Sequence, residues 1–406
     1  MIGANCTLGP QALLPILAEL AAVDNIRVSA MPNAGFPKRE GDRIVYPKSS
    51  PEYFALFARE AAALGVRILG GCCGTTPAHI RAMAEAVKSL RPAKTHPAAP
   101  SVQAVAKPVP VAERDPESKF WKNLQAKKFT VCVEIDPPKG LSLERIYEQV
   151  DKVMASKKVD AIDINSGAMA RVGMDALIVA GALEARGIET VPHLTTRDQN
   201  IIGLQAALLG AWTVGGVRNI LAITGDPPSV GDYPETSGVY EVDSVGLVKV
   251  LHRLNQGTDW AGKTLGGATN FTIGVAVNPV ADDLENEIER FHAKVEAGAH
   301  FAMTQPLFDP QHWHDFLKEL GGKPPIPILI GIWPLNSYKQ ALRLNNEVPG
   351  IVIPESLLKS METAGAAARD RGFEVAREML SWARTELAGA YLIPPFKRYE
   401  EILEIL

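Results

Sequence analysis

The stretch FTVCVEIDPPKGLSLERIYEQVDKVMAS, residues 129–156, contains an apolar strand, a polar loop and an amphipathic helix in succession. Residues 129–135 have the length and the β-branched and aromatic composition of a buried strand. In residues 142–156 the apolar side chains recur at three- and four-residue spacing, which predicts a helix with one buried face. A strand followed by such a helix is the repeating unit of proteins with a parallel sheet.

The same unit recurs through the rest of the chain. Seven further strands are predicted at residues 160–165, 189–194, 218–224, 271–277, 300–305, 326–332 and 390–394. Further amphipathic helices are predicted at residues 174–187, 283–299 and 337–345. Eight strands alternating with helices predict an α/β fold, a TIM (β/α)8 barrel over residues 118–406. A doubly wound open sheet is the competing fold, but the sequence lacks its Gly-x-Gly-x-x-Gly turn after the first strand.

The composition is that of an ordinary globular protein with room for two domains. The chain has 406 residues, of which 46% are hydrophobic and 22% charged, and its formal net charge is -4. This balance implies no basic surface, so nucleic acid is not an expected partner. The apolar runs are shorter than a membrane span, and the first residues lack a signal-peptide pattern. We therefore expect a cytoplasmic protein that does not bind membranes.

Residues 93–117 divide the chain into two unequal parts. They are rich in Pro, Ala and Val without helical or strand periodicity, which is typical of a semi-extended linker. In residues 1–92 three strands are predicted, within MIGANC (1–6), IRVSAMP (26–32) and VRILGGC (66–72). Three strand-helix units are too few to close a barrel, so residues 1–92 are predicted to form a partial second β/α barrel.

Polar residues lie at or just past the carboxyl ends of six predicted strands, where β/α barrels build their sites. They are Glu134, Asn165, His193, Asp226, Asn278 and Gln305. Any one of them alone would be explained as a polar residue beside a loop with an ordinary hydrogen bond. Six in the same register predict a ring of polar groups at one mouth of the barrel.

Six short motifs occur in order along residues 118–406. They are VEIDPPKG (133–140), PHLTTRD (192–198), AITGDPP (222–228), KVEAGAHFAMTQPLFD (294–309), GIWPLNSYKQA (331–341) and YLIPPFKRYE (391–400). Together they resemble the methylenetetrahydrofolate reductase family, whose members are FAD-dependent TIM barrels. The resemblance implies reduction of 5,10-methylenetetrahydrofolate to 5-methyltetrahydrofolate, in one-carbon and methionine metabolism. It also implies a ping-pong mechanism, in which hydride passes from NAD(P)H through FAD to the folate.

The resemblance assigns catalytic roles to three of the residues at the strand ends. Glu134 matches the family's proton donor, which protonates the leaving nitrogen so that the imidazolidine ring of the folate can open. Asp226 matches an aspartate beside the flavin and the pterin, and Gln305 matches a glutamine that hydrogen-bonds the folate. The alternatives are a salt-bridged glutamate, a simple Gly-Asp-Pro-Pro turn and a residue that caps the barrel mouth.

The resemblance also implies which residues bind FAD. The matching residues are His193, Thr195, Asp226, Tyr240, Asp243 and Lys294, with Asn165 and Asn278. A solvated lysine on a helix face is the alternative for Lys294. Thr224 stands where several family members carry Arg, and Asn278 where they carry Tyr, so this chain departs from the family at two of these positions. The electron donor is NADH, NADPH or an electron-carrying partner protein.

Two of the four cysteines, Cys72 and Cys73, are adjacent. The motifs GANC (3–6), MPNAGFP (31–37) and GGCCGTTP (70–77) resemble the last third of a homocysteine S-methyltransferase domain. This resemblance implies that Cys6, Cys72 and Cys73 bind Zn²⁺, which would activate the thiol of homocysteine as a thiolate. The alternative is that they are small buried hydrophobic residues, which is the role we assign to Cys132 in its strand.

The two resemblances together describe a flavoprotein reductase with a partial methyltransferase domain, as in bifunctional homocysteine S-methyltransferase/methylenetetrahydrofolate reductases. Three explanations are expected for the short first part. The chain is a fragment of a longer bifunctional protein, or its first residue was assigned too late in the sequence, or residues 1–92 are a remnant that packs elsewhere. Two other functions stay open. One is zinc-dependent methyl transfer to homocysteine, if a longer chain completes the first barrel. The other is a non-catalytic subunit that binds folate or flavin. Because family members are often oligomeric, a homo-oligomer is expected.

Overall fold

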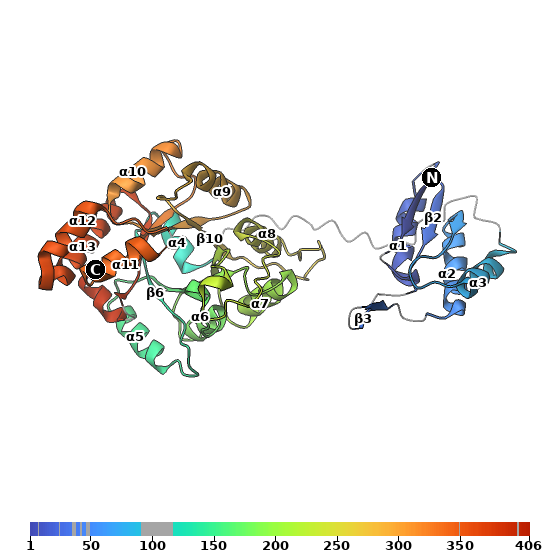
Figure 1. The fold of residues 1–406 in the computed structure, drawn as a ribbon, viewed down its shortest axis with the longest axis horizontal. Coiled ribbons are helices and arrows are strands. Elements are labelled where there is room, and N and C mark those ends of the chain that lie inside the picture. The colour runs from blue at the N-terminus through green and yellow to red at the C-terminus, as the bar shows by residue number, and fades with distance from the viewer. Residues whose placement is uncertain are drawn as a thin grey trace. The chain divides into compact units, whose positions relative to one another are not determined.

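The computed structural model describes residues 1–6, 8–23, 25–34, 38–40, 43–45, 49–90, 117–348, 350–395 and 398–406. The chain forms two compact units, Met1–Lys107 and Pro108–Leu406 (Figure 1). Residues 93–116 of the predicted linker lie outside the described residues, so the linker remains a prediction.

The larger unit is a closed barrel of parallel strands. The strands are β6 (Thr130–Ile135), β7 (Ala161–Ile164), β8 (Thr190–Thr195), β9 (Asn219–Ile223), β10 (Thr272–Val277), β11 (Phe301–Pro306), β12 (Ile328–Ile332) and β13 (Gly389–Leu392). Each strand pairs with the next one along the chain, and β13 pairs with β6 to close the barrel. The predicted TIM barrel is therefore confirmed, and the open-sheet alternative is excluded.

Helices surround this barrel (Figure 1). They are α5 (Glu144–Ala155), α6 (Ala176–Glu184), α7 (Ile201–Thr213), α8 (Ser244–Asn255), α9 (Leu284–Glu296), α10 (Pro310–Glu319), α11 (Tyr338–Glu347), α12 (Glu355–Ala364) and α13 (Ala368–Glu386). Short 3-10 turns are η1 (Ala168–Ala170), η2 (Pro228–Val230), η3 (Gly365–Ala367) and η5 (Tyr399–Glu404). Side-chain caps fix several helix starts, because Asp175, Asp243 and Asp283 each accept a hydrogen bond from a backbone N–H in the first turn.

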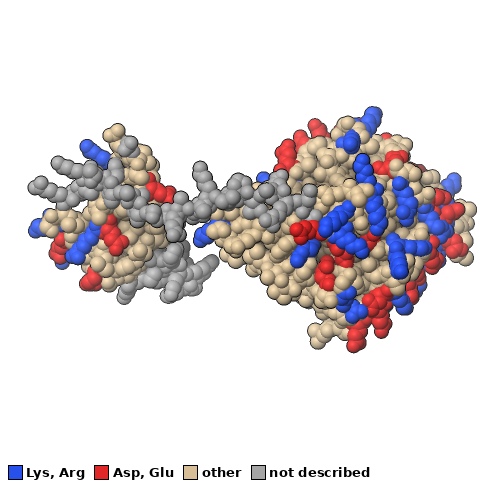
Figure 2. Space-filling model, turned by 180° about the vertical axis from the view of Figure 1, so that it is seen from behind, with Lys and Arg blue, Asp and Glu red and all other residues tan. Residues whose placement is uncertain are grey.

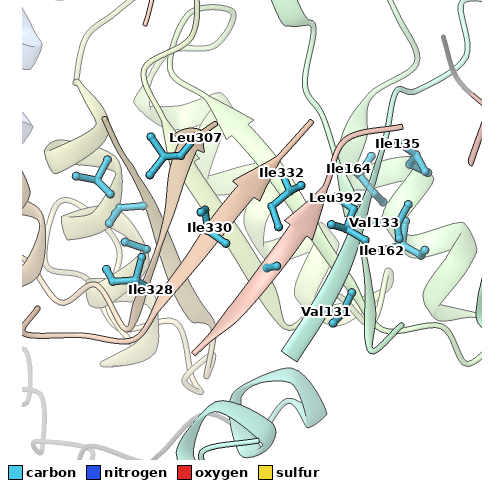
Figure 3. Close-up of a cluster of buried hydrophobic side chains, with 14 of the residues drawn as sticks. Val131, Val133, Ile135, Ile162, Ile164, Leu307, Ile328, Ile330, Ile332 and Leu392 are labelled. Atoms are coloured by element: carbon cyan, nitrogen blue, oxygen red, sulfur yellow. The ribbon is translucent and has the colours of Figure 1, made fainter. Parts of the chain in front are cut away.

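Side chains along each barrel strand alternate between the helices and the barrel interior. Val131, Val133 and Ile135 of β6 belong to the large core cluster, together with residues of β7, β12 and β13 (Figure 3). Cys132 belongs instead to a separate interior cluster with Val191, Leu221 and Leu329, which confirms its predicted core role. Glu134 is in phase with Cys132, so its side chain faces the interior as well.

A short helix, α4 (Lys119–Gln125), closes the interior at the amino-terminal ends of the strands. Phe120 is fully buried in the interior cluster and packs edge-on against Phe301, with ring centroids 4.9 Å apart. Its backbone N–H donates to Glu189 Oε1 at 3.2 Å. Apolar side chains thus fill much of the lower part of the barrel, where the few buried polar groups, such as Asn219 and Thr272, are hydrogen-bonded to one another or to neighbouring residues.

The smaller unit contains a parallel sheet with the strand order β1 (Ile2–Asn5), β2 (Val28–Met31), β5 (Ile68–Leu69). Its helices are α1 (Pro10–Ala21), α2 (Pro51–Ala63) and α3 (Pro77–Val87), and Leu17, Phe54 and Met83 lie in its core. An antiparallel pair, β3 (Lys38–Glu40) and β4 (Arg43–Val45), was not predicted. The three parallel strands agree with the predicted partial β/α barrel.

Neither unit offers a membrane span, because none of the described helices is long and apolar enough to cross a bilayer. On the face of the larger unit seen in Figure 2, Lys and Arg side chains are interspersed with Asp and Glu. This mixture agrees with the small net charge of -4. No continuous basic stripe of the kind that tracks nucleic acid is seen among the described residues of this face.

Candidate active site and cysteine cluster

Two carboxyl groups face each other at the carboxyl ends of β6 and β7. Glu134 and Asp163 are register partners on these parallel strands, and Asp163 is fully buried. Asn165, just past β7, donates from Nδ2 to Glu134 Oε1 at 3.4 Å. Burial, and next the charge of Asp163, raise the pKa of the Glu134 carboxyl to about 8. Glu134 therefore carries a proton at neutral pH.

His193 of β8 completes a buried triangle with the two carboxyl groups. Its Nε2 lies 2.9 Å from Asp163 Oδ1, and one ligand atom from each of the three side chains lies within 4.8 Å of the others. Burial by itself lowers the pKa of His193, but the charge of Asp163 and the hydrogen bond between them raise it overall. Asp163 and His193 therefore form a tightly hydrogen-bonded pair beside the protonated Glu134.

The sequence did not single out Asp163, although a signal was present. In the strand DAIDIN the apolar residues Ile162 and Ile164 point outward to the core cluster, whereas Asp163 is in phase with Ala161 of the interior cluster. An acidic residue at an inward position of a buried strand is costly unless it has a role.

A cavity of about 200 Å³ lies at the ends of β9, β10 and β11. Its polar lining consists of Thr224, Ser244, Asn278, Glu287, Arg290, Lys294 and Gln305. Lys294 is only 5% exposed, and its Nζ donates to the Ala276 carbonyl at 2.7 Å. Burial lowers the pKa of Lys294, against the opposing charge of Glu287 at 3.9 Å. The alternative of a solvated lysine is therefore wrong.

A bulge in β11 sets the position of Gln305 at this cavity. The pairing of β11 with β12 shifts register between Met303 and Pro306. The Thr304 hydroxyl donates to the Gln305 carbonyl at 2.7 Å and accepts from the Gly331 N–H at 3.1 Å. Bulges of this kind re-aim side chains next to active sites. Gln305 and Asn278, both predicted at the mouth, are thereby brought to the same cavity.

Asp226 lies on an exposed loop that three contacts hold over the ends of β8 and β9. Its Oδ2 accepts from the Met169 N–H at 2.7 Å, and its carbonyl accepts from Arg197 at 3.2 Å and from the Tyr240 hydroxyl at 3.0 Å. Gly225 has φ 88°, and a Cβ there would meet Thr195 Cβ at 2.9 Å, so only glycine fits before Asp226. The loop is more constrained than a simple turn. Arg197, which is 6% exposed, belongs to the motif PHLTTRD (192–198), but the sequence alone predicted no role for it.

The remaining predicted flavin contacts lie nearby. Thr195 ends β8 and is buried, and its hydroxyl donates to Asp198 at 3.2 Å. Asp243 caps α8, and its Oδ2 lies 3.7 Å from Arg290, a residue of the cavity. Thr224, at the position of the family's Arg, accepts from the Ser244 N–H at 3.2 Å. The predicted ring of polar residues is thus present at the carboxyl ends of β6 to β11.

The three cysteines of the smaller unit form a compact cluster. Cys73 Sγ lies 3.9 Å from Cys6 Sγ and 3.8 Å from Cys72 Sγ, although Cys6 is 67 positions away in the sequence. Sulfurs that share a tetrahedral zinc with Zn–S bonds of about 2.3 Å lie about 3.8 Å apart. All three are only half-buried, which disfavours a packing role. The donor set and its spacing therefore fit Zn²⁺.

Comparison with known families agrees with this architecture. Residues 119–390 match the family model described as methylenetetrahydrofolate reductase. The chain belongs to this family. Residues 1–87, which precede the reductase barrel, match the model described as homocysteine S-methyltransferase. Both resemblances inferred from the motifs are confirmed.

Relatives match the two parts of the chain separately. The 5,10-methylenetetrahydrofolate reductase of Buchnera aphidicola is 30% identical over 238 residues, covering 57% of this chain and 73% of that protein. Methylenetetrahydrofolate reductase 1 of Schizosaccharomyces pombe is 27% identical over 276 residues, covering 64% of this chain and 42% of that protein. Methionine synthase of Mycobacterium tuberculosis is 40% identical over 114 residues, covering 28% of this chain and 10% of that protein. The chain thus spans less than half of the last two proteins.

Proposed function

We propose that this chain reduces 5,10-methylenetetrahydrofolate to 5-methyltetrahydrofolate, with FAD as cofactor and a reduced nicotinamide as donor. The observation that carries the proposal is Glu134, a carboxylic acid at the mouth of a reductase-family barrel whose pKa of about 8 keeps it protonated at neutral pH. Opening of the imidazolidine ring requires a proton on the leaving nitrogen. A carboxyl group with a pKa near the working pH is suited to supply it.

The residues at the mouth fit FAD in their chemistry. Arg290 and Lys294 are cations for phosphate oxygens, and the amides of Asn278 and Gln305 suit the edges of a ring. An ammonium group has three N–H donors. Among the described residues, Lys294 Nζ donates a hydrogen bond to one acceptor, the Ala276 carbonyl. The volume of about 200 Å³ is below the roughly 300–1,000 Å³ of whole-ligand pockets, so the cavity would hold part of the dinucleotide. Bound FAD would supply hydride transfer between the nicotinamide and the folate.

The other polar residues position the folate in this proposal. Asn165 holds the Glu134 carboxyl in place through its bond to Oε1. Asp226, whose carboxylate is fixed by the Met169 N–H, accepts hydrogen bonds from pterin nitrogens. Gln305 orients the folate from the bulge in β11. Proton transfer from Glu134 then opens the ring to an iminium ion that can accept hydride.

Zinc-dependent methyl transfer to homocysteine is the second candidate function, favoured by the sulfur spacing of 3.8 and 3.9 Å. Cys6, Cys72 and Cys73 would hold the ion, which would supply a thiolate of homocysteine at neutral pH. The matched residues 1–87 form three parallel strands, so we assign this activity only to a chain in which the first barrel is complete. A purely binding subunit is disfavoured, because binding alone does not need a buried proton donor.

Anaerobic absorption spectroscopy tests the reductase directly. We expect a flavin spectrum that bleaches when NADH or NADPH is added and returns when methylenetetrahydrofolate is added. Bleaching only with dithionite, followed by recovery with the folate, would keep the folate reaction and point to a partner protein as electron donor. A protein that cannot be reconstituted with FAD, or a reduced flavin that the folate never reoxidises, would contradict the proposal.

The folate half-reaction should depend on pH through Glu134. The acid form is needed and its pKa is about 8, so the rate of flavin reoxidation by the folate should be constant near neutral pH and fall as pH rises through about 8. Reduction of the flavin by nicotinamide should not follow this profile. Stopped-flow measurement of both half-reactions checks this expectation, and a folate rate that rises with pH would refute the role of the acid form.

Substitution of Lys294 should weaken FAD binding without abolishing the fold. Loss of one charge-assisted hydrogen bond costs about 1.5–3 kcal/mol, so Lys294→Met is expected to raise the Kd of FAD by about 10- to 100-fold. Lys249→Met, on the exposed face of the neighbouring helix α8, is the matched control. Quenching of flavin fluorescence gives both constants. An unchanged Kd for Lys294→Met would remove Lys294 from the cofactor site.

A further inference from the structure

The fully buried Asp163 has only one of its two carboxylate oxygens satisfied. Oδ1 pairs with His193 Nε2 at 2.9 Å, whereas Oδ2 has no hydrogen-bond partner among the described residues. Leaving a buried anionic oxygen unpaired is costly, and the cost is tolerated mostly where the charge has a function. This carboxylate lies beside Glu134, the proton donor of the proposed reduction.

The charged and titratable groups that face Glu134 come from each surrounding element. Asp163 lies on β7, His193 on β8, Asp136 follows β6, Tyr391 lies on β13 and Tyr399 on η5. The Tyr391 hydroxyl donates to the Thr304 carbonyl at 2.6 Å, and the Tyr399 hydroxyl accepts from the Asp136 N–H at 3.4 Å. His193 is therefore the basic side chain in this set, and its Nε2 is already paired with Asp163 Oδ1.

We propose that Asp163 is a positioning residue for the proton of Glu134: its carboxylate, hydrogen-bonded to His193, keeps the Glu134 carboxyl protonated until the folate accepts the proton. The identity of the acceptor rests on the proposed function, whereas the coupling between the three side chains does not. Register pairing puts Asp163 directly beside Glu134 on the neighbouring strand, and among the residues that the structure describes Asp163 Oδ2 has no hydrogen-bond partner. This arrangement favours a single proton on Glu134.

The same arrangement suits the charge that develops in the reaction. The O–H bond of Glu134 breaks as an N–H bond forms on the leaving nitrogen, and the C–N bond breaks with its electron pair remaining on that nitrogen. The other ring nitrogen then forms the iminium cation. The carboxylate that Glu134 becomes and the neighbouring Asp163 then face this cation, and their negative charge stabilises it. The product leaves with the transferred proton on its nitrogen, and Glu134 takes up a new proton from water when the folate site is empty.

Infrared titration of the full-length protein tests the coupling without relying on activity. The carbonyl stretch of a protonated Glu134 is identified by its loss in Glu134→Gln, and its intensity is followed against pH. When Asp163→Asn is added to His193→Gln, we expect the midpoint to fall by about one to two pH units, because a neighbouring negative charge is then removed without a change of charge at position 193. In His193→Gln we expect the midpoint to rise, because a neighbouring positive charge is removed. Shifts of opposite sign are a signature that structural damage does not produce.

Asp160→Asn is the matched control. Asp160 lies three positions before Asp163, at the opposite end of the same strand, and accepts from the Val131 N–H at 3.0 Å. The substitution Asp160→Asn removes the same charge by the same chemical change. It should leave the midpoint of the Glu134 titration unchanged within experimental error. In the His193→Gln background, the pH at which the folate half-reaction slows should move down when Asp163→Asn is added and stay when Asp160→Asn is added.

Several outcomes would overturn the inference. They are an unchanged or raised midpoint when Asp163→Asn is added to His193→Gln, an equal shift when Asp160→Asn is added instead, or a lowered midpoint in His193→Gln alone. A stoichiometric divalent metal that is lost in Asp163→Asn but not in Cys72→Ser would overturn it too, because a cation would then occupy the place of the proton. If the protein fails to reduce the folate while the infrared midpoints shift as expected, the proposed function is wrong and the coupling stands.

Discussion

Replacing Glu134 by Gln is expected to abolish folate reduction while leaving reduction of the flavin by nicotinamide intact. The substitution removes the acidic proton but keeps the size of the side chain and an oxygen for the Asn165 amide, which lies 3.4 Å from Oε1 in the native protein. General acid catalysis contributes about 10²- to 10⁴-fold, so the folate half-reaction should slow by about that factor. Anaerobic stopped-flow measurement of the two half-reactions separates the effects.

Thermal unfolding of the same variant supplies a second readout. The folded pKa of Glu134 is about 8, above its ordinary value of 4.5, so the folded state binds the proton more tightly than the unfolded chain does. The stability that this proton provides is present below pH 4.5 and is lost as pH rises towards 8. Glu134→Gln should therefore flatten the dependence of Tm on pH in this window, and it should not lower Tm at pH 8.

The control for this experiment is Glu148→Gln, on the exposed side of α5. It should change neither half-reaction and leave the pH dependence of Tm as it is. Equal loss of both half-reactions in Glu134→Gln would contradict the role of Glu134 as proton donor, because general damage to the site would then be the simpler explanation.

Replacing Cys72 by Ser is expected to remove zinc from the smaller unit without affecting FAD. The hydroxyl is a far weaker ligand than a thiolate, and even changes to groups outside the ligand set cost about 10- to 100-fold in metal affinity. We expect Cys72→Ser to weaken zinc binding by more than about 100-fold. Metal analysis after dialysis against a competing chelator measures this loss, and the flavin spectrum should stay the same.

Cys132→Ser is the matched control, because it makes the same chemical change in the barrel core. It should leave the zinc content unchanged, and it is expected to lower the stability of the barrel through a buried hydroxyl. Retention of zinc in Cys72→Ser would show that the three sulfurs are not the metal site, whatever their spacing.

The order of strands and helices in the barrel was predictable because each strand is a local pattern. An apolar run bounded by polar loops and followed by an amphipathic helix, as in residues 129–156, needs no knowledge of distant residues. The same holds for the polar side chains at the strand ends, since parallel strands bring their carboxyl ends to one mouth. Glu134 and Gln305 were therefore placed correctly from their positions in the strands.

Three features of the site were missed or left open because they depend on contacts between distant segments. The sequence alone allowed Lys294 to be solvated, but its side chain is buried against the Ala276 carbonyl. Arg197 gave no special signal, although from the loop after β8 it donates to the carbonyl of Asp226. Asp163 looked like one more residue of a short strand, until register pairing placed it beside Glu134.

The sequence by itself determined the fold class from local patterns, and its motifs determined the family, the candidate acid Glu134 and the three candidate zinc ligands through their resemblance to two known families. Only the tertiary structure decided that Glu134 holds a proton at neutral pH and that sulfurs 67 positions apart come within 3.9 Å. A pKa and a metal geometry are set by distances through space and by exclusion of water. Those quantities arise when barrel closure and the pairing of parallel strands bring remote segments together.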